Sequence, residues 1–590
     1  MSEQLAAASG SGRPRSRWGW GYADQELDRS GLEALAPMLR ERLGFGGESI
    51  EDPVDAASIE LAPPRLQPPS SLDGLLTAAP EERMRHAMGK AYRDVIRAFR
   101  GRYERTPDLV ATPRDEEDLR RVLELCAERR LAAIPFGGGT SVVGGVEPRV
   151  GHGYRGVVSI DLGGLSGVVE VDETSGAALI RAGTLGPALE DELRPYGLTL
   201  RHFPQSFEFS TLGGWIATRA GGHFATGPTH IDDLVESVRA LTPTGVWESR
   251  RLPGSGAGPS PDRMLIGSEG ILGVITEAWV RVRPRPGHKA SASVLFDDFR
   301  TAAEAVRAIS QTALQPSNCR LLDPLEAATT GAGDGAHAVL ILGFESPYAP
   351  VDNLLDLATE CALDHGGHLP EPATNDAAGP GGGSPGTQRG APERISDPTN
   401  ADRGVAPGAP PPGTAAQGGT ARDDTPAETW RSAFLSAPYL RDSLIRLGVL
   451  SETFETAITW DRFGEFHSRV SEAARRAVAE AGGTPPEGAG APRVMCRFTH
   501  VYPDGPAPYF TVLAPARRGS EVEQWDEVKA AVSEAIVSAG GTITHHHAVG
   551  RDHRPYYDLQ RPDQFAEALA GAKRAVDPDG LLNPGVLIDP

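Results

Sequence analysis

The stretch IPFGGGTSVVGGVEP, residues 134–148, decides how this chain folds. Glycines let the backbone reach left-handed conformations and leave no side chain to hold a ligand away. Successive N–H groups in such a turn can point into one concavity and bind an anion, with the hydroxyls of Thr140 and Ser141 beside them. A glycine-rich surface turn would have the same composition. The stretch matches neither the GxGxxG nor the Walker pattern, so a nicotinamide Rossmann site or a Walker nucleotide site is not the first choice.

Two further stretches have the same character. They are PQSFEFSTLGGWIATRAGG at residues 204–222 and GSEGILGVIT at residues 267–276. Each of them alone is a turn beside a regular element. Three such stretches within one domain indicate the walls of a single elongated ligand site.

Length, net charge and cysteine spacing exclude several classes of protein. The chain has 590 residues, so we expect several domains. A net charge of -21 argues against nucleic acid as a partner. The cysteines lie far apart, without metal-ligand or CxxC spacing, which favours a reduced, cytoplasmic protein. No apolar signal core and no run long enough to span a membrane is present, so we expect no membrane-spanning segment.

Strand and helix patterns alternate through most of the chain and predict an α+β fold. We predict a helix over 115–130, a strand over 131–136 leading into the glycine loop, and a helical stretch over 81–100. Residues 17–22, RWGWGY, should pack an N-terminal arm onto the body, because exposed tryptophans are costly. Residues 371–427 are rich in Gly and Pro, which predicts a disordered insertion.

The resemblance to a known family rests on the order of these motifs. PFGGGTSV, FEFSTLGGWIATRAGG, GSEGILGVITEA and the C-terminal DPDGLLNPG together resemble the FAD-binding fold of the vanillyl-alcohol oxidase superfamily. RWGWGYADQEL, RYERTPDLV, NCRLLDP, PYLRDSL, ETFETAITWDR and THHHAVGRD resemble the alkyldihydroxyacetonephosphate synthase family within it. The likeness covers nearly everything except the first dozen residues and 371–427. The departures are Gln205, where the family has an acidic residue, and 223–225, where the animal enzymes have a basic pair.

The resemblance implies a two-subdomain PCMH-type FAD-binding domain and an α+β cap domain with an antiparallel sheet. The implied boundaries are an N-terminal arm and helical region at 1–102, the FAD domain at 103–285, the cap at 286–535 with the insertion 371–427, and a C-terminal active-site segment at 536–590.

It also implies non-covalent FAD, held by main-chain amides and small hydroxyls that suit a pyrophosphate and a ribityl chain. The residues implied in the first glycine-rich stretch are Pro135, Phe136, Gly137, Gly138, Gly139, Thr140 and Ser141. Those in the second are Gln205, Ser206, Phe207, Glu208, Phe209, Ser210, Thr211, Thr218, Arg219, Ala220 and Gly221. Those in the third, with one C-terminal residue, are Glu269, Gly270, Ile271, Leu272, Gly273, Val274, Ile275 and Asn583.

The histidine run at 545–547 leaves several readings open. Three histidines in a row cannot share one strand face, because neighbouring side chains alternate. A solvated turn, one core histidine with two exposed ones, or a metal site with His553 nearby would each fit. No carboxylate or cysteine set at ligand spacing accompanies them, so we predict no metal. The resemblance implies that His545, His546 and His547 polarise or deprotonate the substrate, a task that suits imidazole because its pKa is near neutrality.

Tyr509, in the stretch PAPYFTVLA, matches the family's catalytic tyrosine; from the residues alone it reads as a core aromatic on a strand. A phenol acts as an acid or base only if its pKa is lowered, and we expect Arg320, Arg441 or the histidines to lower it. The resemblance implies a substrate-binding role for Arg441 and a role in activity for Arg320. Two arginines would give the fork geometry that a phosphate needs.

The implied reaction exchanges the acyl group of an acyl-dihydroxyacetone phosphate for a fatty alcohol, which makes an ether bond with no net redox change. The alternative is a flavin oxidoreductase acting on a D-2-hydroxy acid or an alcohol. Those relatives carry a GEHG-type histidine where this chain has HHHAVG. A binding module that has lost catalysis is a third reading. The resemblance further implies a lipid substrate with a phosphate head group, a homodimer and peripheral contact with a membrane.

Overall fold

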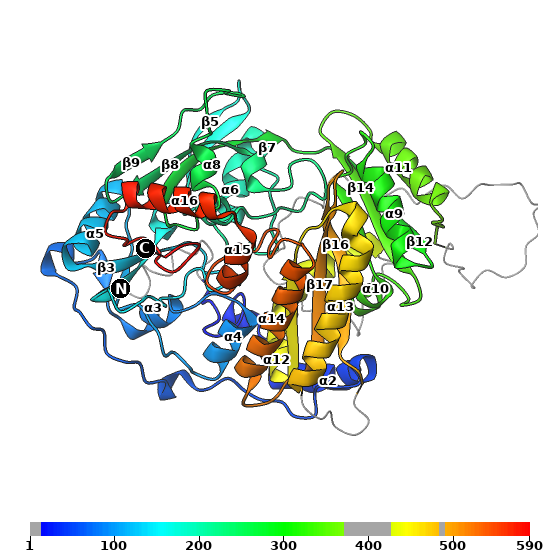
Figure 1. The fold of residues 1–590 in the computed structure, drawn as a ribbon, viewed down its shortest axis with the longest axis horizontal. Coiled ribbons are helices and arrows are strands. Elements are labelled where there is room, and N and C mark those ends of the chain that lie inside the picture. The colour runs from blue at the N-terminus through cyan, green and yellow to red at the C-terminus, as the bar shows by residue number, and fades with distance from the viewer. Residues whose placement is uncertain (1–12, 371–425, 483–489, 590) are drawn as a thin grey trace, which may run out of the picture.

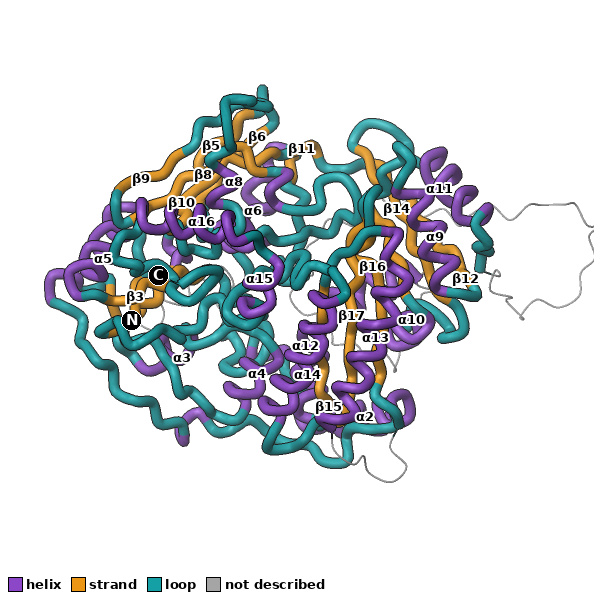
Figure 2. The backbone as a smooth tube through the Cα atoms, viewed as in Figure 1, coloured by secondary structure: helices purple, strands orange, loops and turns teal. Residues whose placement is uncertain are grey.

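The computed structural model describes residues 13–370, 426–482 and 490–589. Two halves lie side by side in Figure 1: one holds the sheets built from residues 76–284, and the other holds a six-stranded sheet with its helices. The region between them consists mainly of loops and short helices, as Figure 2 shows. Among the helices of the described residues, none combines the length and the apolar composition that a membrane span requires.

The first sheet carries the glycine-rich loop. Its order is β1 (Leu76–Thr77), β2 (Leu109–Ala111), β4 (Gly156–Asp161) and β3 (Leu131–Phe136), with β2, β4 and β3 parallel. The crossover from β2 to β3 is α5 (Glu116–Arg129), which begins where the Asp115 carboxylate accepts the Asp118 N–H. The loop therefore starts at the carboxyl end of β3, where a parallel sheet places its ligand sites.

The second sheet is antiparallel and packs on short helices. Its order is β5 (Val168–Asp172), β6 (Ala177–Arg181), β10 (Val274–Arg281), β8 (Val235–Thr242) and β9 (Gly245–Glu248). Its core includes residues of α6 (Gly186–Leu193), α7 (Leu212–Thr218), α8 (Asp262–Leu265) and α16 (Asp563–Val576). This half also contains a two-stranded antiparallel sheet of β7 (Leu198–Thr199) and β11 (Arg283–Pro284).

The six-stranded sheet of the other half is antiparallel. Its order is β12 (His288–Phe296), β14 (Ala338–Ser346), β13 (Asn318–Leu322), β16 (Arg493–Val501), β17 (Pro506–Pro515) and β15 (Val449–Glu455). On β14 the side chains alternate, so that Leu340 and Leu342 face one apolar cluster and Val339 and Ile341 face another.

Helices cover both faces of this sheet. The larger cluster includes residues of α9 (Phe299–Ser310), α11 (Asp352–Asp364), α13 (Trp460–Gly482) and α14 (Glu521–Ser538). The opposite face meets α10 (Pro324–Thr330), α12 (Pro426–Arg446) and the N-terminal α2 (Arg29–Leu43). The short α15 (Arg554–Gln560) lies between the halves in Figure 1.

One expected helix is interrupted. The spacing predicted a helical stretch over 81–100, but α3 (Pro80–Arg85) and α4 (Tyr92–Phe99) are separate. At the break, Lys90 N–H donates to the Ser141 carbonyl at 2.6 Å, and a Cβ on Gly89 would lie 2.1 Å from that oxygen. The helical stretch is therefore confirmed at its two ends and interrupted over 86–91, where this contact with the distant glycine loop lies. Of the predicted insertion 371–427, residues 371–425 lie outside the described residues. Its last two residues belong to α12, which begins at Pro426.

Candidate active site

The glycine-rich segments converge on one another. A Cβ on Gly137 would lie 2.4 Å from Thr211 Oγ1, and a Cβ on Gly270 would lie 3.0 Å from the Pro135 ring. The Glu269 N–H donates to the Ala217 carbonyl at 2.8 Å. The first, second and third stretches are therefore neighbours in space, although 142 positions separate residues 134 and 276 in the sequence.

The first loop presents free donors. The backbone N–H groups from Gly138 to Ser141 donate no hydrogen bond to any residue that the structure describes. The loop is half-buried, and Gly139 has the positive φ of +68° that turns it. Consecutive amides of this kind bind anionic oxygens. The loop thus fits the pyrophosphate of a dinucleotide such as FAD.

The side chains of the third segment are mostly buried in the protein core. Ile271, Leu272, Val274 and Ile275 are buried in apolar clusters, so their side chains face away from any ligand. The Asn583 side-chain amide donates to the carbonyls of Gly145 at 3.1 Å and Glu269 at 2.7 Å. Asn583 therefore ties the C-terminal segment to two of the glycine-rich loops.

Phe209 and Arg219 of the second segment have structural partners. Phe209 is buried and packs edge-on against Trp20 and Tyr22 of the N-terminal arm. Arg219 lies at the surface and forms an ion pair with Asp232 at 3.0 Å. Their contribution to a bound cofactor would come from the backbone.

The histidine run is a turn built around one buried carboxylate. The backbone N–H groups of His545, His546 and His547 all donate to Glu455, at the end of β15, and the Thr544 hydroxyl donates to it as well. Burial raises the pKa of Glu455 to about 7, while these donors hold it down. These four donors hold the backbone of the turn that carries the three successive imidazoles.

A second buried carboxylate holds the residues that follow. Glu269 accepts the N–H groups of Val549 at 2.9 Å and Gly550 at 2.8 Å. Burial raises its pKa to about 7. Glu455 comes from the six-stranded half and Glu269 from the glycine-loop half, so the segment 545–550 is held by both halves at once.

The imidazoles form a cluster with residues that the sequence did not single out, among them His230, His500 and Tyr502. His545 Nε2 lies 2.8 Å from the Tyr502 hydroxyl, and the rings of His500 and His545 are 4.9 Å apart. One ring nitrogen each of His500, His545 and His546 lies within 4.8 Å of the others. A metal there would displace existing partners, since His500 Nε2 lies 3.1 Å from the Gly222 carbonyl.

This cluster is neutral at physiological pH. Burial lowers the pKa of His546 to about 3 and the pKa values of His545 and His547 well below the ordinary value. It adjoins the second glycine-rich stretch, because a Cβ on Gly221 would lie 3.1 Å from both His500 and His546. The imidazoles are therefore free bases placed against the cofactor half.

Tyr509 lies beside the histidines, but its pKa is shifted in the direction opposite to the one expected. Its ring is 6.2 Å from His546 and 5.8 Å from His547, centroid to centroid. Burial raises its pKa, and the cation that opposes this is Arg497, whose guanidinium carbon lies 3.9 Å over the ring. The expected lowering was wrong because the tyrosine is 5% exposed and desolvation outweighs one cation. Tyr509 therefore keeps its proton at neutral pH and can donate a hydrogen bond.

The two expected arginines occupy different places. Arg320 on β13 is buried and donates to the His223 carbonyl at 2.9 Å, and its charge acts on His500 and His546. Arg441 on α12 donates from Nη1 to the Lys90 carbonyl at 2.7 Å. No contact recorded for the described residues joins them, so the single fork of two arginines is not observed.

Two of the three guanidinium nitrogens of Arg441 have no protein partner among the described residues. Its Nε and Nη2 are buried and form no hydrogen bond with any residue in the described part of the chain. Burying guanidinium donors without a partner is costly, so a ligand oxygen is the natural partner. The nearby cation is Lys90, whose pKa burial lowers to about 8.

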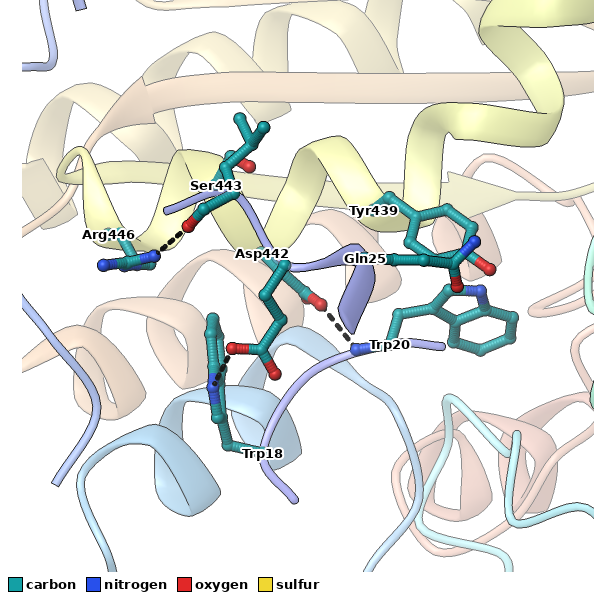
Figure 3. A pocket seen from close by; sticks show the side chains of 9 residues that line it. Trp18, Trp20, Gln25, Tyr439, Asp442, Ser443 and Arg446 are labelled. Carbon is teal, nitrogen blue, oxygen red and sulfur yellow. Dashed lines mark hydrogen bonds between the residues drawn. The ribbon is translucent and has the colours of Figure 1, made fainter. Parts of the chain in front are cut away.

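The N-terminal arm covers the helix that bears Arg441. Trp18, Trp20 and Tyr22 are buried, which confirms the predicted packing of RWGWGY. The Trp20 N–H donates to the Asp442 carboxylate, as Figure 3 shows, and Lys90 Nζ donates to the Gly19 carbonyl at 2.6 Å. The arm therefore contacts Asp442, which follows Arg441 in the sequence, and Lys90, whose carbonyl accepts a hydrogen bond from Arg441.

The carboxylate beneath the histidine turn gives a stability prediction. Glu455→Ala removes the acceptor of four donors, of which the His547 N–H keeps only the Thr544 hydroxyl, and we expect it to lower the free energy of unfolding by about 3 kcal/mol. Urea denaturation of the full chain measures this. The matched control is Glu465→Ala on α13, whose side chain is 81% exposed and should change stability little. Equal stability of the two variants would contradict the role given to Glu455.

Two flavoenzyme domains match this chain. Residues 107–249 match the pattern of the FAD binding domain, and residues 285–370 and 412–587 match that of the FAD linked oxidases, C-terminal domain. Alkyldihydroxyacetonephosphate synthase of Trypanosoma brucei brucei is 29% identical over 86% of this chain and 77% of its own length. Glycolate oxidase subunit GlcD of Bacillus subtilis is 24% identical, over 82% and 89%.

A solved structure of an alkyldihydroxyacetonephosphate synthase has the same fold. It superposes with a TM-score of 0.72 at 24% identity, over 96% of this chain and 97% of that one. The α+β fold predicted from the sequence, with an FAD-binding domain and a cap, is thereby confirmed.

Proposed function

Because this chain belongs to the FAD-linked oxidase family, we propose that it is an FAD-dependent alkyldihydroxyacetonephosphate synthase. It would exchange the acyl group of an acyl-dihydroxyacetone phosphate for a fatty alcohol. The observation that carries the proposal is that Nε and Nη2 of Arg441 are buried and have no hydrogen-bond partner among the described residues. A substrate with a phosphate head group supplies the missing oxygens.

The chain's own residues account for binding. The free amides from Gly138 to Ser141 would hold the FAD pyrophosphate. Arg441 would take two phosphate oxygens of the substrate, and Lys90 would add positive charge beside it. When bound, FAD supplies the reactive flavin ring over which the exchange takes place.

The proton movements follow from the titration of the site. In the exchange, the bond from the substrate carbon to the acyl oxygen breaks, a bond to the alcohol oxygen forms, and the alcohol loses its proton. A neutral imidazole of the histidine turn would accept that proton, since these rings are unprotonated at neutral pH. Tyr509 keeps its own proton and would donate a hydrogen bond to the oxygen that carries negative charge.

The direct test is an assay of ether formation. Purified protein with FAD, acyl-dihydroxyacetone phosphate and labelled hexadecanol should yield labelled alkyl product and free fatty acid. The similarity to GlcD favours oxidation of a 2-hydroxy acid as the second candidate. Loss of flavin colour with D-lactate, without ether product, would support that candidate and overturn the proposal.

Arg441 gives the second prediction. Arg441→Ala should lower kcat/KM for the phosphate-bearing substrate by roughly 10–100-fold, the effect of one or two charged hydrogen bonds. The loss should fall mainly on KM, because the phosphate contact exists before and during the reaction. Steady-state kinetics measure it, with Arg469→Ala, an exposed arginine on α13, as the control. An unchanged KM would remove Arg441 from the head-group site.

Dimer formation, membrane contact and a cytoplasmic location remain predictions from the sequence.

A further inference from the structure

Outside the candidate active site, a second group of metal-ligating side chains lies on the outer part of the six-stranded sheet. Asp297 follows β12, His337 precedes β14 and His368 follows α11. One ligand atom from each lies within 4.8 Å of the others. The three residues come from three separate segments, so the fold alone brings them together.

The strand register explains the grouping. Phe296 pairs with Ala338, so Asp297 and His337 are opposite one another at the next position. His368 forms a bridge with Leu295, with hydrogen bonds of 2.9 Å in both directions. Residues directly opposite, and those two apart on one strand, share a face, so all three side chains point to the same side.

Their geometry suits a divalent metal of the Zn²⁺ type. His337 Nε2 lies 3.6 Å from Asp297 Oδ1, and the rings of His337 and His368 are 5.3 Å apart. Ligands at Zn²⁺ distances in a tetrahedral site are about 3.3 Å from one another. Small side-chain rotations would therefore close the site, and its exposure leaves room for a water ligand.

A fourth residue orients His337. Its Nδ1 lies 2.9 Å from Asp334 Oδ2, and Asp334 Oδ1 accepts the backbone N–H groups of Ala336 and His337. This bond places the proton on Nδ1 and leaves Nε2, the nitrogen nearest Asp297, as an acceptor. A carboxylate behind a histidine in this way is the usual support of a metal-ligating imidazole.

We propose that Asp297, His337 and His368 bind one Zn²⁺-type ion, with Asp334 as the supporting carboxylate. The ion would join the end of β12, the start of β14 and the chain beyond α11. It would thereby fix the edge strand β12 and the point where the chain leaves this sheet. The role is structural and is separate from the proposed exchange reaction.

The test is calorimetric titration of Zn²⁺ into the full FAD-loaded protein. We expect one ion per chain at this site, an affinity at least tenfold lower for His337→Ala, and about 10–100-fold lower for Asp334→Asn, which keeps all three ligands. Asp297→Asn removes a ligand carboxylate but keeps the shape of the side chain, so weaker Zn²⁺ binding by this variant would not come from a folding defect. The matched control is His365→Ala on the same segment, whose Nδ1 lies 2.8 Å from the Cys361 carbonyl, and it should bind as the wild type does.

Three results would overturn the proposal. They are no Zn²⁺ uptake by the wild type, equal affinity of the wild type and His337→Ala, or loss of binding in His546→Ala but not in His337→Ala. The last would place the ion in the histidine cluster of the candidate active site.

Discussion

Replacing Tyr509 by phenylalanine is expected to lower kcat for ether formation by about 10²–10³-fold, the range for removing one hydrogen-bond donor to a developing oxyanion. The hydroxyl is the only group removed, and the ring keeps its place over Arg497 and beside His546. FAD content should therefore be unchanged, as the absorbance of the purified protein will show.

The pH dependence follows from the direction of the shift. Because the pKa of Tyr509 is raised from its ordinary value of 10.0, the phenol keeps its proton throughout the neutral range. The wild type should lose no activity from ionisation of Tyr509 below pH 10.

The control for the substitution of Tyr509 is Tyr556→Phe on α15, whose hydroxyl donates to the Ala530 carbonyl at 3.2 Å. Full activity of Tyr509→Phe would make the residue a core aromatic.

Gly138→Ala is expected to abolish FAD binding. The new Cβ would lie 1.6 Å from the Phe209 carbonyl oxygen and 2.9 Å from the Ser210 Cα, and all these atoms belong to the backbone. One of the two loops must move by roughly 1.5 Å to restore van der Waals contact. That movement displaces the free amides that start at Gly138. The ratio of flavin to protein absorbance after purification measures the outcome.

A matched control exists close by in the chain. Gly151 is exposed, and a Cβ there meets nothing within 4 Å, so Gly151→Ala should retain FAD fully. If Gly138→Ala also retained FAD and stability, the close approach of the two loops could not be what shapes the cofactor site.

Much of the fold could be predicted from local pattern. The strand over 131–136 is β3 at the predicted residues, and the helix over 115–130 is α5 within one residue at each end. These elements depend on interactions between near neighbours, such as the Asp115 cap and the acidic first turn. The break between α3 and α4 could not be predicted, because its cause is the Ser141 carbonyl, far along the chain.

The residues of the candidate site also divide into those that local sequence motifs identify and those that they do not. The glycine-rich stretches, Tyr509, Arg441 and the histidine run were named from motifs, and their catalytic and binding roles are still predictions. Glu455, Arg497, His500 and Tyr502 were missed, because a glutamate or histidine that will be buried has no distinguishing local pattern. Glu455 stands inside the quoted motif ETFETAITWDR, where nothing marks it as the acceptor for three histidine amides.

The sequence by itself therefore determined the α+β elements, the three glycine-rich loops and the family, since these depend on residue type, spacing and order. Only the tertiary structure decided the protonation of the site and the separation of Arg320 from Arg441. The physical reason is that a pKa depends on burial and on charges brought from distant segments. Desolvation keeps the proton on Tyr509 and keeps protons off the histidines, and no stretch of sequence contains that information.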